Sequence, residues 1–239
     1  LLRQAFDGTR PDESFRKAIK SLPAANLPQP RFVHTRKASM RSQVIERLTG
    51  GRKGHLVIGS GFYEECDDEE SESLIDSLRI ELVQNRRLAR NAKLDLVLNP
   101  DRCQGLHVQA ERLVENGWRL RKPGSCYTEH SQARLHAKYL FLAQNTGAGE
   151  IGPARIYIGS ANFSRRGFDG FGKRGNLEAG VVIAPDSQLS WRRNASNGIR
   201  DLLPGDFDTQ VELAALAAGA VFETPPDPPP PPPVTFVEW

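Results

Sequence analysis

The feature that most constrains the fold is a series of short apolar runs separated by amphipathic stretches. The first run, His55–Gly59, has the sequence HLVIG, which is typical of a strand buried on both faces. We expect further strands at the similar runs 93–98, 118–120, 137–143, 155–159 and 180–184. Apolar residues recur at helical spacing in the intervening segments 43–48, 74–88 and 107–116. This alternation predicts an α/β fold in which a mixed, mostly parallel β-sheet is sandwiched between helices.

The 239 residues divide by composition into four parts. Residues 1–39 are polar and basic, and we expect them to form an N-terminal extension. Residues 40–205 form the main domain, and the Ala- and Leu-rich residues 206–224 are expected to form a C-terminal helix. Residues 225–239 are a polyproline linker and tail, because eight of the nine residues 225–233 are proline. Such a run forms a stiff polyproline II rod, which serves as a spacer or as a ligand for a proline-binding groove.

The net charge of +3 conceals an uneven distribution of charge. Seven of the nine residues 64–72 are acidic, and without them 32 basic residues face 22 acidic ones, a balance of +10. A basic body with one acidic patch favours a polyanionic partner. The alternative is that these charges only solvate the surface.

Several classes of protein are disfavoured by the sequence. No apolar run has the length of a membrane-spanning helix, and residues 1–10 lack the apolar stretch of a secretion signal. The three cysteines are scattered, which disfavours a disulfide-stabilised secreted scaffold. We therefore expect a cytoplasmic protein with no membrane partner. Leu at position 1 is what we expect of a piece of a longer chain.

Residues 134–183 contain the groups that indicate a chemical function. His136 and Lys138 are two residues apart on a predicted strand, so their side chains point to the same side. An imidazole beside an ammonium group offers a nucleophile next to an anion-binding group. Ser160 and Asn162 lie in a turn after the next strand and add donors for phosphoryl oxygens. Glu178 enters another strand and is placed to accept a hydrogen bond from the second ring nitrogen of His136.

These residues resemble a known signature. The pair His136-x-Lys138 on an apolar strand, followed by Gly-Ser160-x-Asn162, is similar to the HKD motif of the phospholipase D superfamily. The stretch Asn-x-Glu178-x-Gly-Val also resembles that family. The resemblance covers roughly residues 40–186 and implies a phospholipase D-like fold.

The resemblance also implies a mechanism. In that family one histidine attacks phosphorus to form a covalent phosphohistidine, a second histidine protonates the leaving oxygen, and water then releases the phosphate. Neither a metal nor another cofactor takes part. By position, His136 corresponds to the nucleophile or to its acid counterpart. Lys138, Ser160 and Asn162 correspond to the phosphoryl-binding groups, and Glu178 corresponds to the residue that orients the histidine.

The sequence departs from the HKD pattern in two places. The aspartate of the motif falls at Ala143, and this aspartate is also absent in the tyrosyl-DNA phosphodiesterase branch of the family, which the chain resembles most. The spacing is also longer, because residues 144–153 are inserted between the two motif strands and residues 165–175 lengthen the loop before Glu178. Insertions in loops cost little free energy.

The loop after the motif favours nucleic acid as the substrate, with DNA first. It carries two aromatic residues and four cations that we expect to bind substrate: Arg165, Arg166, Lys173 and Arg174. Cations bind phosphates and rings stack on bases. The sequence therefore predicts a nuclease, acting alone or as a module of a larger DNA-processing or defence assembly. Two alternatives stay open: a phosphodiesterase for lipids or small molecules, and a catalytically silent domain that binds nucleic acid.

The number of motifs bears on assembly, because the family mechanism needs two histidines and the chain has one such motif. We expect a homodimer that joins two copies of His136 at one interface, or a second motif beyond Trp239. A separate alternative concerns Cys103, His107, Cys126 and His130, which have the chemistry of zinc ligands. Their spacing is not that of a known zinc finger.

Overall fold

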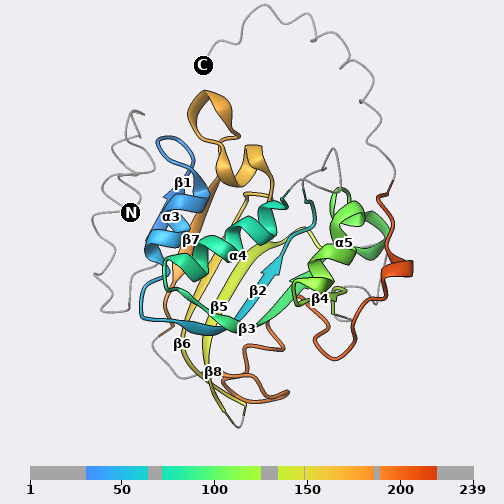
Figure 1. Cartoon of the computed structure of the whole chain (residues 1–239). Coiled ribbons are helices and arrows are strands. Elements are labelled where there is room, and N and C mark those ends of the chain that lie inside the picture. The colour runs from blue at the N-terminus through green and yellow to red at the C-terminus, as the bar shows by residue number, and fades with distance from the viewer. Residues whose placement is uncertain (1–30, 64–71, 125–133, 148, 186–188, 220–239) are drawn as a thin grey trace, which may run out of the picture.

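The protein is described here by a computed structural model, which covers residues 31–63, 72–124, 134–147, 149–185 and 189–219. Its centre is one sheet with the strand order β1-β7-β6-β5-β2-β3-β4, and β8 pairs with β6 (Figure 1). The strands are β1 Arg31–His34, β2 Lys53–Gly59, β3 Leu88–Val97, β4 Trp118–Arg121, β5 Lys138–Gly147, β6 Glu150–Gly159, β7 Ala179–Ile183 and β8 Leu189–Ser190. The α-helices of the described residues are α3 Met40–Arg47, α4 Leu74–Gln84 and α5 Leu106–Glu115.

The expected α/β fold with a mixed sheet is confirmed, but the expectation of a mostly parallel sheet is wrong. Only β2 with β3 and β3 with β4 run parallel among the described strands. The other pairs, including β5 with β6 and β6 with β7, are antiparallel. The inserted residues 144–153 explain part of this difference, because they extend β5 and β6 into one long hairpin instead of forming a separate loop.

The α-helices of the described residues pack on one face of the sheet, so within this part of the chain the sheet is not sandwiched between helices as expected. In Figure 1, α3, α4 and α5 lie on the same side, where their apolar residues share a core with Leu56, Ile58 and Leu140. The opposite face is covered by irregular chain from 189 to 207, which packs against Val57 and Phe141. Two helices begin at a serine, a residue type that caps helices well: Ser39 Oγ accepts from Ser42 N at 3.1 Å, and Ser73 Oγ accepts from Asp76 N.

The predicted C-terminal helix over 206–224 does not form within the described residues. Residues 206–219 have no regular secondary structure apart from one 3₁₀ turn at Leu213–Ala215. Their main-chain groups bond to neighbouring segments: Val211 N donates to Leu120 O at 2.9 Å, and Ala217 O accepts from Cys103 N at 3.0 Å. Tertiary hydrogen bonds therefore replace helical ones, and they bury Val211 in the core. Residues 220–224 and the polyproline linker lie outside the described residues.

The end of the expected N-terminal extension belongs to the sheet. Residues 31–34 form β1, which pairs antiparallel with β7, and Val33 is fully buried. Residues 1–30 and the core of the acidic run, 64–71, lie outside the described residues. None of the described helices has the length and apolar character needed to cross a membrane.

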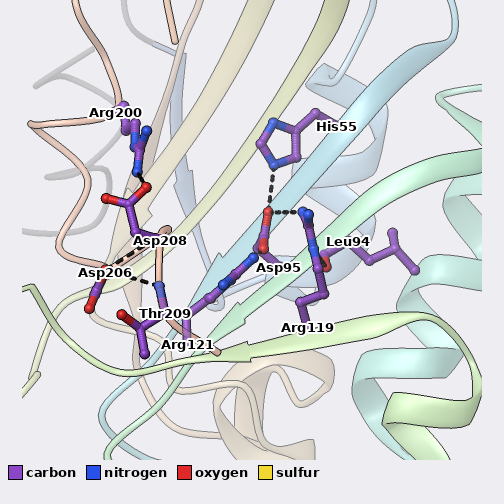
Figure 2. Close-up of polar contacts among 9 residues, drawn as sticks. All are labelled: His55, Leu94, Asp95, Arg119, Arg121, Arg200, Asp206, Asp208 and Thr209. Atoms are coloured by element: carbon purple, nitrogen blue, oxygen red, sulfur yellow. Dashed lines mark hydrogen bonds and ion pairs between the residues drawn. The ribbon is translucent and has the colours of Figure 1, made fainter. Parts of the chain in front are cut away.

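A buried ion network lies on the sheet face opposite the helices (Figure 2). Asp95 on β3 accepts from His55 Nε2 at 2.8 Å and from the guanidinium groups of Arg119 at 2.6 Å and Arg121 at 2.8 Å. The ring of Trp191, from the segment that covers this face, lies 4.4 Å from the His55 ring. The network therefore joins three strands and supports the covering segment.

The protonation of His55 should make the stability of the protein depend on pH. Burial lowers the pKa of His55 below 6.5, and the hydrogen bond and charge of Asp95 only partly oppose this shift. As pH falls below 6.5, the unfolded chain takes up a proton that the folded chain does not, so stability present above that pH is lost. Between pH 7.5 and 5, urea unfolding of a His55→Gln variant should show a weaker loss than wild type. One proton accounts for at most about 1.4 kcal/mol per pH unit.

A His107→Gln variant is the matched control, because His107 is exposed on α5. It should keep the wild-type pH dependence. An unchanged pH dependence in His55→Gln would contradict the assignment to His55.

Candidate active site

The three motif segments meet at one edge of the sheet. Lys138 begins β5 and pairs with Gly159, the last residue of β6. Gly159 in turn pairs with Gly180 near the start of β7. Because of this register, His136, Ser160 and the residues before β7 come together although they are far apart in sequence.

His136 and Lys138 are in direct contact. Lys138 Nζ lies 3.1 Å from His136 Nε2. His136 is exposed, whereas Lys138 is only 5% exposed. Burial lowers the pKa of Lys138, and the negative charge of Glu178 acts in the opposite direction. An ammonium group can only donate, so with Lys138 charged the lone pair of Nε2 accepts from Lys138 Nζ in this contact.

The carboxylate of Glu178 is held by neighbours on its own edge. Its Oε2 accepts from Ser160 Oγ, and its Oε1 accepts from Asn176 Nδ2 at 3.3 Å. The second hydrogen bond of Ser160 is to the main chain of β7, where Ala179 N donates to Ser160 Oγ at 3.1 Å. The contacts of Glu178 thus run to Ser160 and Asn176, and its predicted role in orienting His136 stays a prediction.

Asn162 lies just beyond the strand in the same turn. It is half-buried, and its side-chain Oδ1 is buried without a hydrogen-bond partner. A buried polar atom without a partner costs free energy and is typical of functional sites. The main chain of this turn is well held, because Ser164 N donates to Asn162 O at 2.8 Å.

Two motif glycines are required by the ring of Tyr157. A Cβ atom at Gly159 would lie 2.3 Å from the Tyr157 hydroxyl oxygen, and one at Gly180 would lie 2.6 Å from a ring carbon of Tyr157. Burial raises the pKa of Tyr157, and the charge of Glu178 raises it further. Tyr157 therefore stays a neutral phenol beneath the site and fills the space over these glycines of β6 and β7.

Sequence reasoning missed Asn99, which holds the residue before His136. Asn99 Oδ1 accepts from Leu135 N at 2.9 Å, and Asn99 Nδ2 donates to Leu135 O at 3.1 Å. The Asn99 side chain is buried, and its amide bonds to both main-chain groups of Leu135, as the main chain of a neighbouring strand would. Leu135 lies in the segment that precedes β5. In the sequence, Asn99-Pro100 indicates only the end of a strand, so nothing there points to this role.

Thr35 was missed for a different reason, since it falls in the expected extension. Thr35 is 1% exposed, its Oγ1 accepts from Glu178 N at 2.7 Å, and its main-chain N donates to Glu178 O at 3.0 Å. Thr35, the residue after β1, therefore holds the main chain of Glu178 in place. No local sequence signal indicates this pairing, which depends on how β1 meets β7.

The four predicted substrate-binding cations are exposed beside this edge. Arg165 and Arg166 begin the π-helical turn η3, Arg165–Asp169, and Lys173 and Arg174 end the 3₁₀ turn η4, Gly172–Arg174. Asn176 N donates to Arg166 O at 3.0 Å, which ties the loop to the segment that carries Glu178.

The zinc alternative finds no support among the residues that the structure describes, where no three His, Cys, Asp or Glu side chains are grouped to hold a metal. Cys103 is buried, its thiol donates to Ala217 O at 3.3 Å, and burial raises its pKa to about 11. His107 is exposed on α5. Cys126 and His130 lie outside the described residues.

Comparisons with known proteins give a fold but no close relative. No protein-family profile matches the sequence. No curated protein matches it either. Among solved structures, yeast tyrosyl-DNA phosphodiesterase matches with 15% identity and a TM-score of 0.50, over 82% of this chain and 60% of that one. Two histidine mutants of the yeast enzyme match with a TM-score of 0.52, over 84% of this chain and 60% of theirs.

This likeness shows that the chain has the fold of a tyrosyl-DNA phosphodiesterase, which agrees with the phospholipase D-like fold expected from the motif. The chain spans 60% of the length of the yeast enzyme. At an identity of 15%, the similarity supports a shared fold and does not by itself assign an activity.

The contact between Tyr157 and Gly180 predicts a steric cost for a small substitution. A Gly180→Ala variant should be destabilised by roughly 1–3 kcal/mol, because the new Cβ meets the Tyr157 ring and Ile158 O. Urea unfolding measures this cost. Combined with Tyr157→Leu, the loss should be smaller than the sum of the two single losses. Additive losses would show that the ring does not set the limit at Gly180.

Proposed function

We propose that the chain is the histidine-bearing part of a metal-independent phosphodiesterase that cleaves nucleic acid, DNA in the first place. The observation that carries the proposal is the 3.1 Å contact between Lys138 and His136, at the edge where Ser160 and Glu178 also meet. In the proposed reaction Lys138 Nζ moves from Nε2 to a phosphoryl oxygen, which frees the Nε2 lone pair to attack while the cation offsets the charge of the phosphodiester.

The proposed reaction has two displacement steps. In the first, His136 Nε2 forms a bond to phosphorus while the bond from phosphorus to the leaving oxygen breaks, and a second histidine gives that oxygen a proton. In the second, a water oxygen attacks phosphorus, the N–P bond breaks, and the second histidine takes the proton of the water. Lys138, Ser160 and Asn162 are proposed to bind the phosphoryl oxygens.

The proposed reaction needs a second histidine from outside this motif. A second copy of the chain in a homodimer, joined at the active-site face, supplies one, and so does another segment of a longer protein. The 60% coverage of the yeast enzyme is compatible with both sources. If the protein forms a dimer, a mass measurement of the assembly will show it.

Replacement of His136 tests the mechanism. His136→Ala should abolish cleavage of labelled DNA, because it removes the attacking nitrogen, and EDTA should leave the wild-type rate unchanged. The assay uses single-stranded DNA, duplex DNA, RNA, a chromogenic phosphodiester and phosphatidylcholine side by side. His107→Ala is the matched control and should retain full activity. Strict dependence on a divalent ion would rule out the mechanism, and cleavage of phosphatidylcholine alone would replace the proposed substrate class.

Asn99 should affect the rate rather than substrate binding. Asn99→Ala frees the main chain of Leu135, so His136 is less often aligned with phosphorus, and we expect kcat to fall by about 10-fold or more with little change in KM. Asn116→Ala, which removes an exposed amide that donates to Asp76 away from the site, should leave kcat unchanged. An equal effect of both variants on kcat would show that Asn99 acts only through stability.

A further inference from the structure

Two basic segments from distant parts of the sequence meet beside the candidate site. The turn after β1 contains Arg36 and Lys37, and the loop before β7 contains Lys173 and Arg174. Gly172 N donates to Thr35 O at 3.0 Å, so the two segments are in contact. In Figure 1 the blue loop after β1 and the orange loop before β7 project beyond the same end of the sheet.

The charges of these segments face solvent. All four cations are exposed. Among the salt bridges between described residues, none involves Lys37, Lys173 or Arg174. Exposed cations grouped in this way attract phosphates and raise their local concentration.

The loop that carries two of these cations has a closed, well-defined base. The main chains of Gly170 and Gly175 approach so closely that a Cβ at position 175 would lie 2.4 Å from the carbonyl carbon of Gly170. Gly172 at the tip has a φ of 57°, which favours glycine. The loop is therefore held as a narrow platform and does not depend on its side chains for its shape.

An aromatic ring stands on this platform between the cations. Phe171 is 48% exposed, so part of its side chain is accessible to a ligand. A base can stack on this ring only when the face of the base is free. The bases of an unpaired strand offer such faces, whereas the bases inside a duplex are stacked on each other. The combination of exposed cations with an exposed ring therefore fits single-stranded nucleic acid better than a duplex.

The platform is tied directly to the catalytic edge. Thr35, which contacts Gly172, is also the residue whose Oγ1 and N bond to the main chain of Glu178. One buried residue therefore links the platform to the segment that carries Glu178.

We propose that Arg36, Lys37, Phe171, Lys173 and Arg174, here named the basic ridge, bind the unpaired nucleic acid strand that flanks the scissile phosphodiester. The cations contact phosphates and Phe171 stacks on one base. This inference rests on the proposed function for its substrate class. It adds that the substrate is recognised as a single strand, at a place separate from the groups that carry out the reaction.

Binding measurements on the full chain with His136→Ala, which prevents cleavage, test the ridge. Fluorescence anisotropy with a labelled single-stranded DNA and with the matching duplex gives Kd between 50 and 300 mM salt. Neutralising three cations, Lys37→Gln/Lys173→Gln/Arg174→Gln, should weaken single-strand binding by about 10-fold or more and lower the salt slope by roughly 2. Phe171→Leu should weaken single-strand binding by roughly 5-fold or more and leave duplex binding unchanged.

The matched control removes three exposed arginines near the opposite edge of the sheet: Arg52→Gln/Arg86→Gln/Arg90→Gln. It changes net charge by the same amount and should affect Kd less than the ridge variant does. If both triple variants change Kd equally, the proposed role of the ridge is wrong. It is also wrong if Phe171→Leu changes Kd for the duplex and for the single strand by the same factor. If the ridge substitutions weaken binding but the wild-type chain cleaves none of the substrates, the binding role of the ridge is supported and the proposed function is contradicted. Cleavage of single strands that the ridge variant does not slow overturns the ridge alone.

Discussion

The packing of two tyrosine rings over strand glycines is the constraint on which the candidate site depends. On the helix-covered face, Tyr157 lies across Gly159 and Gly180, and on the other face Tyr139 lies against Gly59. These contacts leave no room for a side chain at positions 59, 159 and 180, at the edge where His136 and Ser160 lie. The small residues of the motif are thus explained by packing within the sheet before any role in binding a phosphate is considered.

The same edge is stabilised on two flanks by side chains that form hydrogen bonds with main-chain groups, as a neighbouring strand would. Asn99 pairs with the main chain of Leu135 on one flank, and Thr35 pairs with the main chain of Glu178 on the other. Both side chains are buried, so their hydrogen bonds compete little with water. The site therefore sits on the rigid part of the fold, while the basic ridge is built on loops whose main chain is closed by glycine contacts.

The sequence was sufficient for elements whose signal is local. The run HLVIG at His55–Gly59 is buried as expected, and the Ser39 cap begins a helix. It was insufficient where tertiary contacts outweigh local preference: the residues around Val211 bond to β4 instead of forming a helix, and β1 joins the sheet although its surroundings resemble an extension. Strand direction was misjudged because periodicity reports burial, not whether a hairpin or a crossover connects two strands. Asp95 could not be found either, since its partners Arg119 and Arg121 come from another strand.

The exposure of the site itself constrains how it can work. Lys138 is buried, but His136 is exposed, and Leu177, next to Glu178, is 83% exposed. The proposed second step needs water at the phosphohistidine, and an exposed His136 meets that need. The exposed Leu177 side chain would gain free energy if another surface covered it. In the proposed mechanism the second histidine has to approach this same exposed face, so the surface that carries it is the candidate to cover Leu177.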